Sequence, residues 1–155
     1  VLVLAAFLAS ANPCEGFKGV LWKECRLAAW SASMEYPDVF PIENLWESGQ
    51  SADLEAPDLG IKVVFYGGEV HRGTLMGEFE ASLGAMAGQQ GRVVRQILEN
   101  DWFELQGAFQ DGRNFYLRTI VQDGIAAHLY VEYPSDEALR LEGVCRRMGE
   151  SMRID

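Results

Sequence analysis

The segment from Asp101 to Tyr133 decides the fold class, and it reads DWFELQGAFQDGRNFYLRTIVQDGIAAHLYVEY. Three runs rich in aromatic and β-branched residues are separated by two copies of Gln-Asp-Gly, at 110–112 and 122–124. Runs of this composition, with glycine in the connecting turns, are typical of β-strands joined by tight hairpin loops. We therefore predict an antiparallel meander of three strands.

The length of each Gln-Asp-Gly loop determines which side chains share a face of the sheet. A two-residue Asp-Gly loop would give one mixed face, with Trp102, Glu104, Leu117, His128 and Tyr130. A three-residue loop, in which glycine takes a positive φ, shifts the alternation by one residue. The apolar residues then gather on one face: Phe103, Leu105, Phe115, Leu117, Val121, Leu129, Val131 and Tyr133. We therefore predict three-residue loops at both places.

The opposite face of the meander is the candidate partner-binding surface. In the predicted register five side chains project from it: Trp102, Tyr116, Arg118, His128 and Tyr130. Trp, Tyr and Arg are the side chains most often found at binding hot spots. Two alternatives remain open for this face. Another element could cover it and make Trp102 and Tyr130 core residues, or the histidine could act in acid–base catalysis.

Residues 1–11, VLVLAAFLASA, have the apolar core and small-residue end of a secretory signal. We expect them to be a signal-peptide remnant, with cleavage after Ala9-Ser10-Ala11, and residues 12–155 to form a single domain. The mature protein should then be periplasmic or secreted, without membrane insertion. A lipoprotein is the alternative because Cys14 follows closely, but Pro13 stands where a lipidation site needs a small residue.

Charge and cysteine usage narrow the classes of partner. The chain has 23 acidic and 13 basic residues, a net charge of −10, which argues against a general nucleic-acid or anionic-membrane binder. Three cysteines in an oxidising compartment suggest one disulfide, for which Cys14 and Cys25 are the expected pair and Cys25–Cys145 the alternative. The two histidines are far apart and no Cys-x-x-Cys occurs. We expect neither a metal site nor a cofactor.

Apolar spacing predicts the remaining elements, although residues 12–28 fit either a short helix or an extended lead-in. We expect strands at 27–36, 51–55, 61–66 and 92–99. A helix should begin after Thr74 and end at Gly88 or Gly91. A second helix, capped by Ser135, should bury the stripe Leu141, Val144, Cys145 and Met148. This order predicts an α+β domain in which two main helices cover an antiparallel sheet.

Several segments resemble PsbP-like domains. These are Tyr36-Pro37 followed by Phe40, DGRNFYLRTIV at 111–121, AHLYVEYP at 127–134, and ESMRI at 150–154. The resemblance implies an α/β/α sandwich shared by the extrinsic P subunit of photosystem II, a Ran-binding nuclear import factor and small exported bacterial proteins. Such proteins work chiefly through protein contacts, and no functional residue can be carried over from them to this chain.

Two main functions follow as expectations. The first is an exported, non-enzymatic interaction or accessory module, monomeric, with a protein partner in the cell envelope. The second is a carrier that holds a small apolar ligand between the sheet and its helices. A hydrolase-type enzyme is a remote third, because no catalytic residue can be named and no Gly-x-Ser-x-Gly occurs. Should Trp102 belong to the core, the next binding candidates are Trp46, Glu43 and Glu47.

Overall fold

The structure is a computed structural model that describes residues 19–45 and 49–155. The expected signal-peptide remnant, Cys14, Trp46 and Glu47 lie outside the described residues. Glu43 is exposed on a short strand. In the part of the chain that the structure describes, neither helix is long and apolar enough to cross a membrane.

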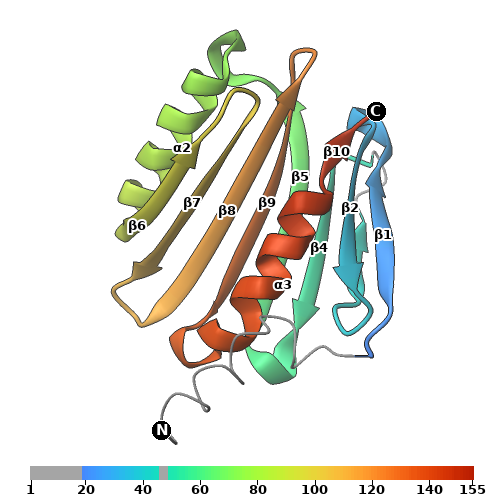
Figure 1. The fold of residues 1–155 in the computed structure, drawn as a ribbon, viewed down its shortest axis with the longest axis vertical. Helices are drawn as coiled ribbons and strands as arrows, with labels where there is room; N and C mark the ends of the chain where they lie inside the picture. Colours follow the sequence, from blue (N-terminus) through green and yellow to red (C-terminus); the bar gives the residue numbers. More distant parts are fainter. Residues whose placement is uncertain (1–18, 46–48) are drawn as a thin grey trace, which may run out of the picture.

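The elements follow one another as ten strands and two helices within the described ranges (Figure 1). They are β1 (Trp22–Leu27), β2 (Ala32–Pro37), β3 (Ile42–Leu45), β4 (Ser51–Ala56), β5 (Ile61–Glu69), α2 (Leu75–Gly88), β6 (Gly91–Leu98), β7 (Trp102–Phe109), β8 (Arg113–Gln122), β9 (Ile125–Pro134), α3 (Ala138–Ser151) and β10 (Arg153–Ile154). Seven strands form one sheet in the order β3-β4-β5-β9-β8-β7-β6, and β1-β2-β10 form a second, smaller sheet. All recorded strand pairs are antiparallel.

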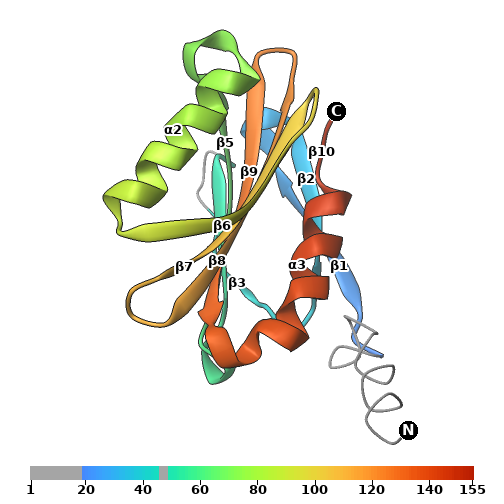
Figure 2. The same ribbon diagram turned by 60° about the vertical axis from the view of Figure 1, so that its left-hand side comes forward.

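The large sheet is the central layer of the molecule. Helix α2 lies on one side of it, while α3 and the small sheet lie on the other (Figure 2). On the α2 side, Phe79 and Met86 pack against Phe103, Leu105, Phe115 and Leu117. The larger core fills the α3 side and joins both sheets to the helix. The predicted α+β fold with two covering helices is therefore confirmed, while the separate three-stranded sheet was not foreseen.

The two Gln-Asp-Gly loops differ in length, which corrects half of the register prediction. Phe109 and Arg113 flank a three-residue loop, in which Gly112 has φ +85°, as expected. Gln122 pairs with Ile125, so the second loop has only two residues, and both Asp123 and Gly124 have positive φ. Such a turn matches the strand twist of a two-residue hairpin.

The shorter second loop moves β9 by one residue relative to the prediction. Leu129, Val131 and Tyr133 consequently face α3 and the small sheet, whereas Phe103, Leu105 and Leu117 face α2. The prediction assumed that the meander has a single apolar face. It was wrong because both faces of this sheet are covered by other elements and both carry core residues.

The helix predictions are confirmed except for one cap. Thr74 is the N-cap of α2, where its hydroxyl accepts a hydrogen bond from the Gly77 amide at 3.0 Å. The stripe of α3 is buried as expected. Ser135 does not cap α3, because residues 135–137 form a separate 3₁₀ turn and the helix begins at Ala138 without a side-chain cap. The strand expected over 27–36 is wrong in its start, because residues 28–30 form a 3₁₀ turn between β1, which ends at Leu27, and β2, which begins at Ala32.

Candidate partner-binding surface

The register divides the five candidate residues between the two faces of the large sheet. Trp102, Tyr116 and Arg118 lie on the face toward α3, because Glu104 is paired with Arg118 and Gln106 with Tyr116. His128 and Tyr130 lie on the face toward α2, opposite Thr119 and Leu117. The five side chains therefore do not form one surface, and each face has to be considered separately.

On the α3 side, a buried carboxylate holds three neighbours together. Glu104 is 6% exposed, and it accepts hydrogen bonds from the Tyr116 hydroxyl at 2.9 Å and from the Gln106 amide at 2.7 Å. Arg118 completes the cluster with a 3.4 Å ion pair to Glu104. Burial and the neighbouring carboxylate raise the pKa of Tyr116 far above its ordinary value. Tyr116 is thus a neutral donor that anchors Glu104 inside the fold.

Trp102 and Arg118 form a stacked pair at the edge of this cluster. The guanidinium carbon of Arg118 lies 3.9 Å from the centroid of the Trp102 ring, a cation–π contact. Both residues line a hollow of about 240 Å³ that continues to Met152 and Ile154 at the end of α3. Trp102 is partly exposed, so its ring is available to a binding partner.

Beyond this pair, toward β6, the sheet surface is left open by α3, whereas Arg118 and Glu104 lie at the inner border under the end of the helix. The helix packs mainly against β2, β9 and β8, and β6 and β7 extend beyond it (Figure 1). We call this surface the α3-side platform. It consists of Arg92, Arg95 and Ile97 of β6, Trp102, Glu104 and Gln106 of β7, and Arg118 and Ile120 of β8. Ile97, Trp102 and Ile120 are partly exposed and give the platform apolar area.

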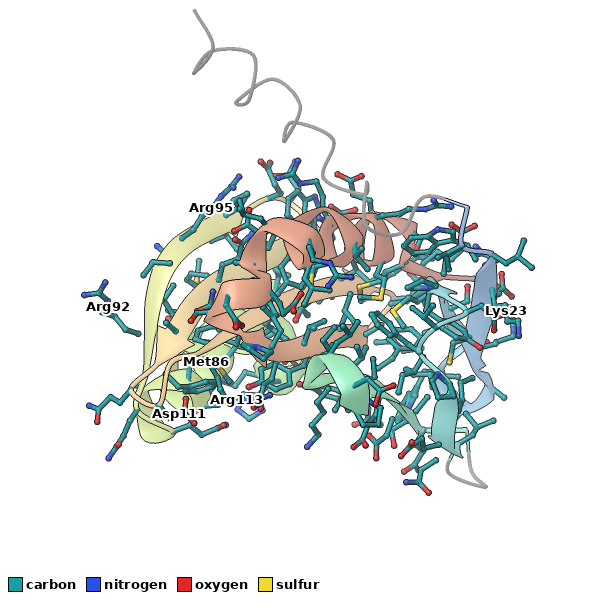
Figure 3. All side chains as sticks on the ribbon, turned by 90° about the horizontal axis from the view of Figure 1, so that it is seen from below. Lys23, Met86, Arg92, Arg95, Asp111 and Arg113 are labelled. Carbon is teal, nitrogen blue, oxygen red and sulfur yellow. The ribbon has the colours of Figure 1, made fainter. Side chains whose placement is uncertain are left out.

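Three exposed arginines, two on the platform and one beside it on α3, form no ion pair with a described residue. Arg92 and Arg95 project from the outer strand β6, with Arg95 on the side where α3 lies (Figure 3). Arg146 belongs to α3, one turn before Gly149, which contacts Tyr116 and Arg118. Within residues 19–45 and 49–155, every other arginine forms an ion pair, but Arg92, Arg95 and Arg146 do not.

On the α2 side, His128 is a buried structural residue. Its ring stacks on Tyr66 at 4.5 Å between centroids, and its Nδ1 shares a 2.7 Å hydrogen bond with the Thr119 hydroxyl. Nε2 lies 3.8 Å from the Glu78 carboxylate, which also accepts a hydrogen bond from the His71 amide. Burial lowers the pKa of His128 to about 4, so the ring is neutral near pH 7. His128 lines neither the hollow beside α2 nor the one beside Trp102.

Tyr130 borders a small apolar hollow beside α2. The hollow measures about 200 Å³ and is open to solvent, and its walls include Tyr66, Met86, Leu117 and Tyr130. The Tyr130 hydroxyl donates a 2.7 Å hydrogen bond to Glu132, and burial raises its pKa well above the ordinary value. The walls of this hollow are mainly apolar, unlike those of the hollow beside Trp102.

The structure also bears on the metal and disulfide expectations. No group of three or more His, Cys, Asp or Glu residues in the described ranges could hold a metal ion. Cys25 and Cys145 are free thiols, each 1% exposed. The structure therefore does not show the expected Cys14–Cys25 disulfide, and Cys14 is outside its described part.

Comparisons with known proteins identify the architecture. No family model matches the chain, and no curated protein matches its sequence. Among solved structures, cyanobacterial PsbP (CyanoP) from Synechocystis sp. PCC 6803 superposes with a TM-score of 0.65, covering 92% of this chain and 97% of that one at 8% identity. The chain has a PsbP-like fold.

A second solved structure extends the PsbP-like comparison to another bacterium. A protein from Bacteroides thetaiotaomicron VPI-5482 matches with a TM-score of 0.52 and 13% identity, over 86% of this chain and 48% of that one. At these identities the likeness concerns the fold alone. The side chains of the α3-side platform therefore have to be interpreted from their own chemistry.

Sequence reasoning missed the arginines of this PsbP-like fold. Arg92 and Arg95 were placed on a predicted strand, but their position at the open edge of the sheet depends on the strand order. A usable signal was present, because the strand GRVVRQIL carries two arginines and no acidic residue in a chain with excess negative charge.

Proposed function

We propose that this protein is an exported, non-catalytic accessory module that binds a partner protein through its α3-side platform. The observation that carries the proposal is the Trp102–Arg118 stack on an open sheet face next to a hollow of about 240 Å³. Trp and Arg combine a large contact area with directional hydrogen bonding and dominate binding hot spots. The hollow is of a size that accommodates one or two side chains of a partner.

The alternatives have weaker support in the described residues. A carrier usually encloses its ligand in a pocket of about 300–1,000 Å³, whereas the apolar hollow beside Tyr130 is open and about 200 Å³. A catalytic histidine needs access to substrate, whereas His128 is 7% exposed and packed against Tyr66. The PsbP-like fold also favours a non-enzymatic role.

Export is supported by the leader-like composition of residues 1–11 and by the resemblance to PsbP-like domains, which include small exported bacterial proteins. Intact-mass analysis of the exported material tests this part of the proposal. A mature form that begins at Asn12 supports signal cleavage, and a lipid-modified Cys14 contradicts it.

The binding role is tested by comparing two tryptophan variants. Trp102→Ala removes the stack on the platform, and Trp22→Ala removes a similar stack on β1, where Arg147 lies 3.7 Å from the ring centroid. Both tryptophans are partly exposed and each stacks on one arginine, and Trp22 additionally packs against the main core. The partner is captured from a periplasmic extract with the wild-type protein, identified by mass spectrometry, and titrated against each variant.

We expect Trp102→Ala to weaken partner binding by about 2 kcal/mol or more, the size of a hot-spot truncation. Trp22→Ala should bind as the wild type does. Equal losses in both variants would mean that reduced stability explains the effect, and unchanged binding in both would remove the platform from the account. Native mass spectrometry of the purified protein tests the carrier alternative through any small molecule that copurifies.

A further inference from the structure

We infer that the α3-side platform recognises an acidic segment of its partner protein, one in which carboxylate side chains flank an apolar or aromatic residue. The inference rests on the proposed function and adds the chemistry of the partner. Three features of the platform support it. Arginines without an ion pair lie on its surface, its buried carboxylate Glu104 is already bound by neighbouring side chains, and apolar side chains lie between the arginines and Trp102.

The cationic charge of the platform contrasts with the charge of the whole chain. Acidic residues outnumber basic ones by 23 to 13, so a basic side chain on the surface usually has a carboxylate within reach. Arg92, Arg95 and Arg146 form no ion pair with a described residue. All three are exposed, and they belong to the strand and helix that border the same open face. Glu142 and Glu150, however, lie one turn from Arg146 on α3. The inference therefore rests on Arg92 and Arg95.

Within strands β6, β7 and β8, the carboxylate on this face does not compensate these two arginines. Glu104 is buried and already holds Tyr116, Gln106 and Arg118. The guanidinium groups of Arg92 and Arg95 therefore remain free to bind carboxylates from outside. Arginine suits this task because its planar fork donates two parallel hydrogen bonds to one carboxylate.

Apolar area lies between the arginines and the Trp102 ring. Ile97 is on the strand that carries Arg92 and Arg95, and Ile120 is directly opposite Trp102 in the sheet register. Both isoleucine side chains are partly exposed, and Ile120 lines the hollow at the end of α3.

Arg92 and Arg95 lie farther along the platform than the hollow, opposite Ala108 and Gln106. Asp101, in contrast, lines the hollow itself. A partner segment that places an apolar residue at the Trp102 end and carboxylates at the arginine end matches this arrangement.

The net charge of −10 favours a compact acidic segment over an extended polyanion. A nucleic acid or an anionic membrane spreads negative charge beyond the platform, where it meets the acidic remainder of this chain. A short protein segment can keep its carboxylates within reach of the arginines. A second copy of this chain is also acidic, but such a contact would be heterologous and would favour open-ended assembly.

The test uses matched charge reversals on opposite faces of the sheet. Arg95→Glu acts on the platform, and Lys62→Glu acts on an exposed residue of β5 that also lacks an ion pair among the described residues. Each substitution changes the net charge by the same amount. Arg95→Gln separates loss of the positive charge from its reversal.

Four probes are compared. Two are fluorescein-labelled synthetic peptides, one of glutamate and leucine and one of lysine and leucine; the others are a thymidine oligonucleotide and phosphatidylglycerol vesicles. Binding is measured by fluorescence anisotropy, or by cosedimentation for vesicles, at low and high salt. We expect the glutamate–leucine peptide to bind the wild-type protein, and its affinity to fall at high salt. Its affinity for Arg95→Glu should be about tenfold lower, and its affinity for Lys62→Glu should equal that for the wild type.

Other outcomes overturn the inference. These are equal losses in Arg95→Glu and Lys62→Glu, tighter binding of the lysine–leucine peptide, the oligonucleotide or the vesicles, and concentration-dependent self-association that Arg95→Glu abolishes. Titrating the captured partner against both Trp102→Ala and Arg95→Glu distinguishes failure of this inference from failure of the proposed function. If Trp102→Ala weakens partner binding but Arg95→Glu does not, the platform binds a partner that is not acidic; if neither does, both proposals fail.

Discussion

Gly149 of α3 lies against Tyr116 of β8 with no room for a side chain. A Cβ at residue 149 would come within 2.4 Å of the Tyr116 hydroxyl oxygen and 2.6 Å of Arg118 Cδ. The close approach allows α3 to pack directly over the cluster of Glu104, Tyr116 and Arg118. Gly149 therefore helps to set the boundary between the part of the sheet that α3 contacts and the exposed α3-side platform.

Gly149→Ala should destabilise the fold by about 2 kcal/mol, because overpacking a filled site costs more than the higher helix propensity of alanine gains. The control is Gly84→Ala in α2, where an added Cβ meets nothing within 4 Å. That change should stabilise the protein by about 1 kcal/mol. Chemical denaturation measures both, and a Gly149→Ala variant as stable as Gly84→Ala would contradict the packing described.

His128 should make stability depend on pH between about 4 and 6.5. Burial lowers its pKa to about 4 from the ordinary 6.5, so in this range the unfolded chain binds a proton that the folded chain excludes. This contribution to stability is complete above pH 6.5 and is lost as the pH falls toward 4. The loss is about 1.4 kcal/mol for each pH unit within that window.

The measurement compares His128→Gln with His71→Gln in denaturation experiments at several pH values. Glutamine at 128 can still share a hydrogen bond with Thr119 but does not titrate, so the variant should lose this part of the pH dependence. His71→Gln makes the same substitution at the exposed histidine and controls for the loss of an imidazole as such. An unchanged slope in His128→Gln would show that other groups cause the acid sensitivity.

Both described cysteines should resist alkylation in the folded protein. Burial raises the pKa of the Cys25 thiol to about 11, and it raises the pKa of Cys145 as well. The reactive thiolate is therefore rare and inaccessible at both positions. We expect iodoacetamide to modify Cys25 and Cys145 only after unfolding, as measured by peptide mapping. A native disulfide to either residue, including Cys14–Cys25, would contradict this expectation.

The fold could be predicted from local sequence signals, but the composition of the site could not. The strand runs, the Thr74 cap and the apolar stripe of α3 depend on neighbouring residues, and the structure confirms them. The second hairpin depended on a choice between two loops for the same tripeptide, Gln-Asp-Gly. Only the packing of Leu129 and Val131 against the opposite core determines that choice.

That choice also decided which candidate residues are neighbours. Trp102, Tyr116 and Arg118 share a face and a contact network, as the sequence suggested, but His128 and Tyr130 lie on the other face. The unpaired arginines could not be placed from sequence, because an ion pair depends on which strands and helices become neighbours in space. Strand order is a long-range property that periodicity does not report.

The most direct test of the central claim is photocrosslinking from each face of the large sheet. Benzoylphenylalanine replaces Ile97 on the α3-side platform, or Val64 of β5 on the opposite face; both residues are partly exposed and apolar. The account predicts that irradiation links the captured partner to position 97, through an acidic segment, and leaves position 64 unlinked. Crosslinks from position 64 with none from position 97 would show that the partner binds the α2 side and would contradict the account.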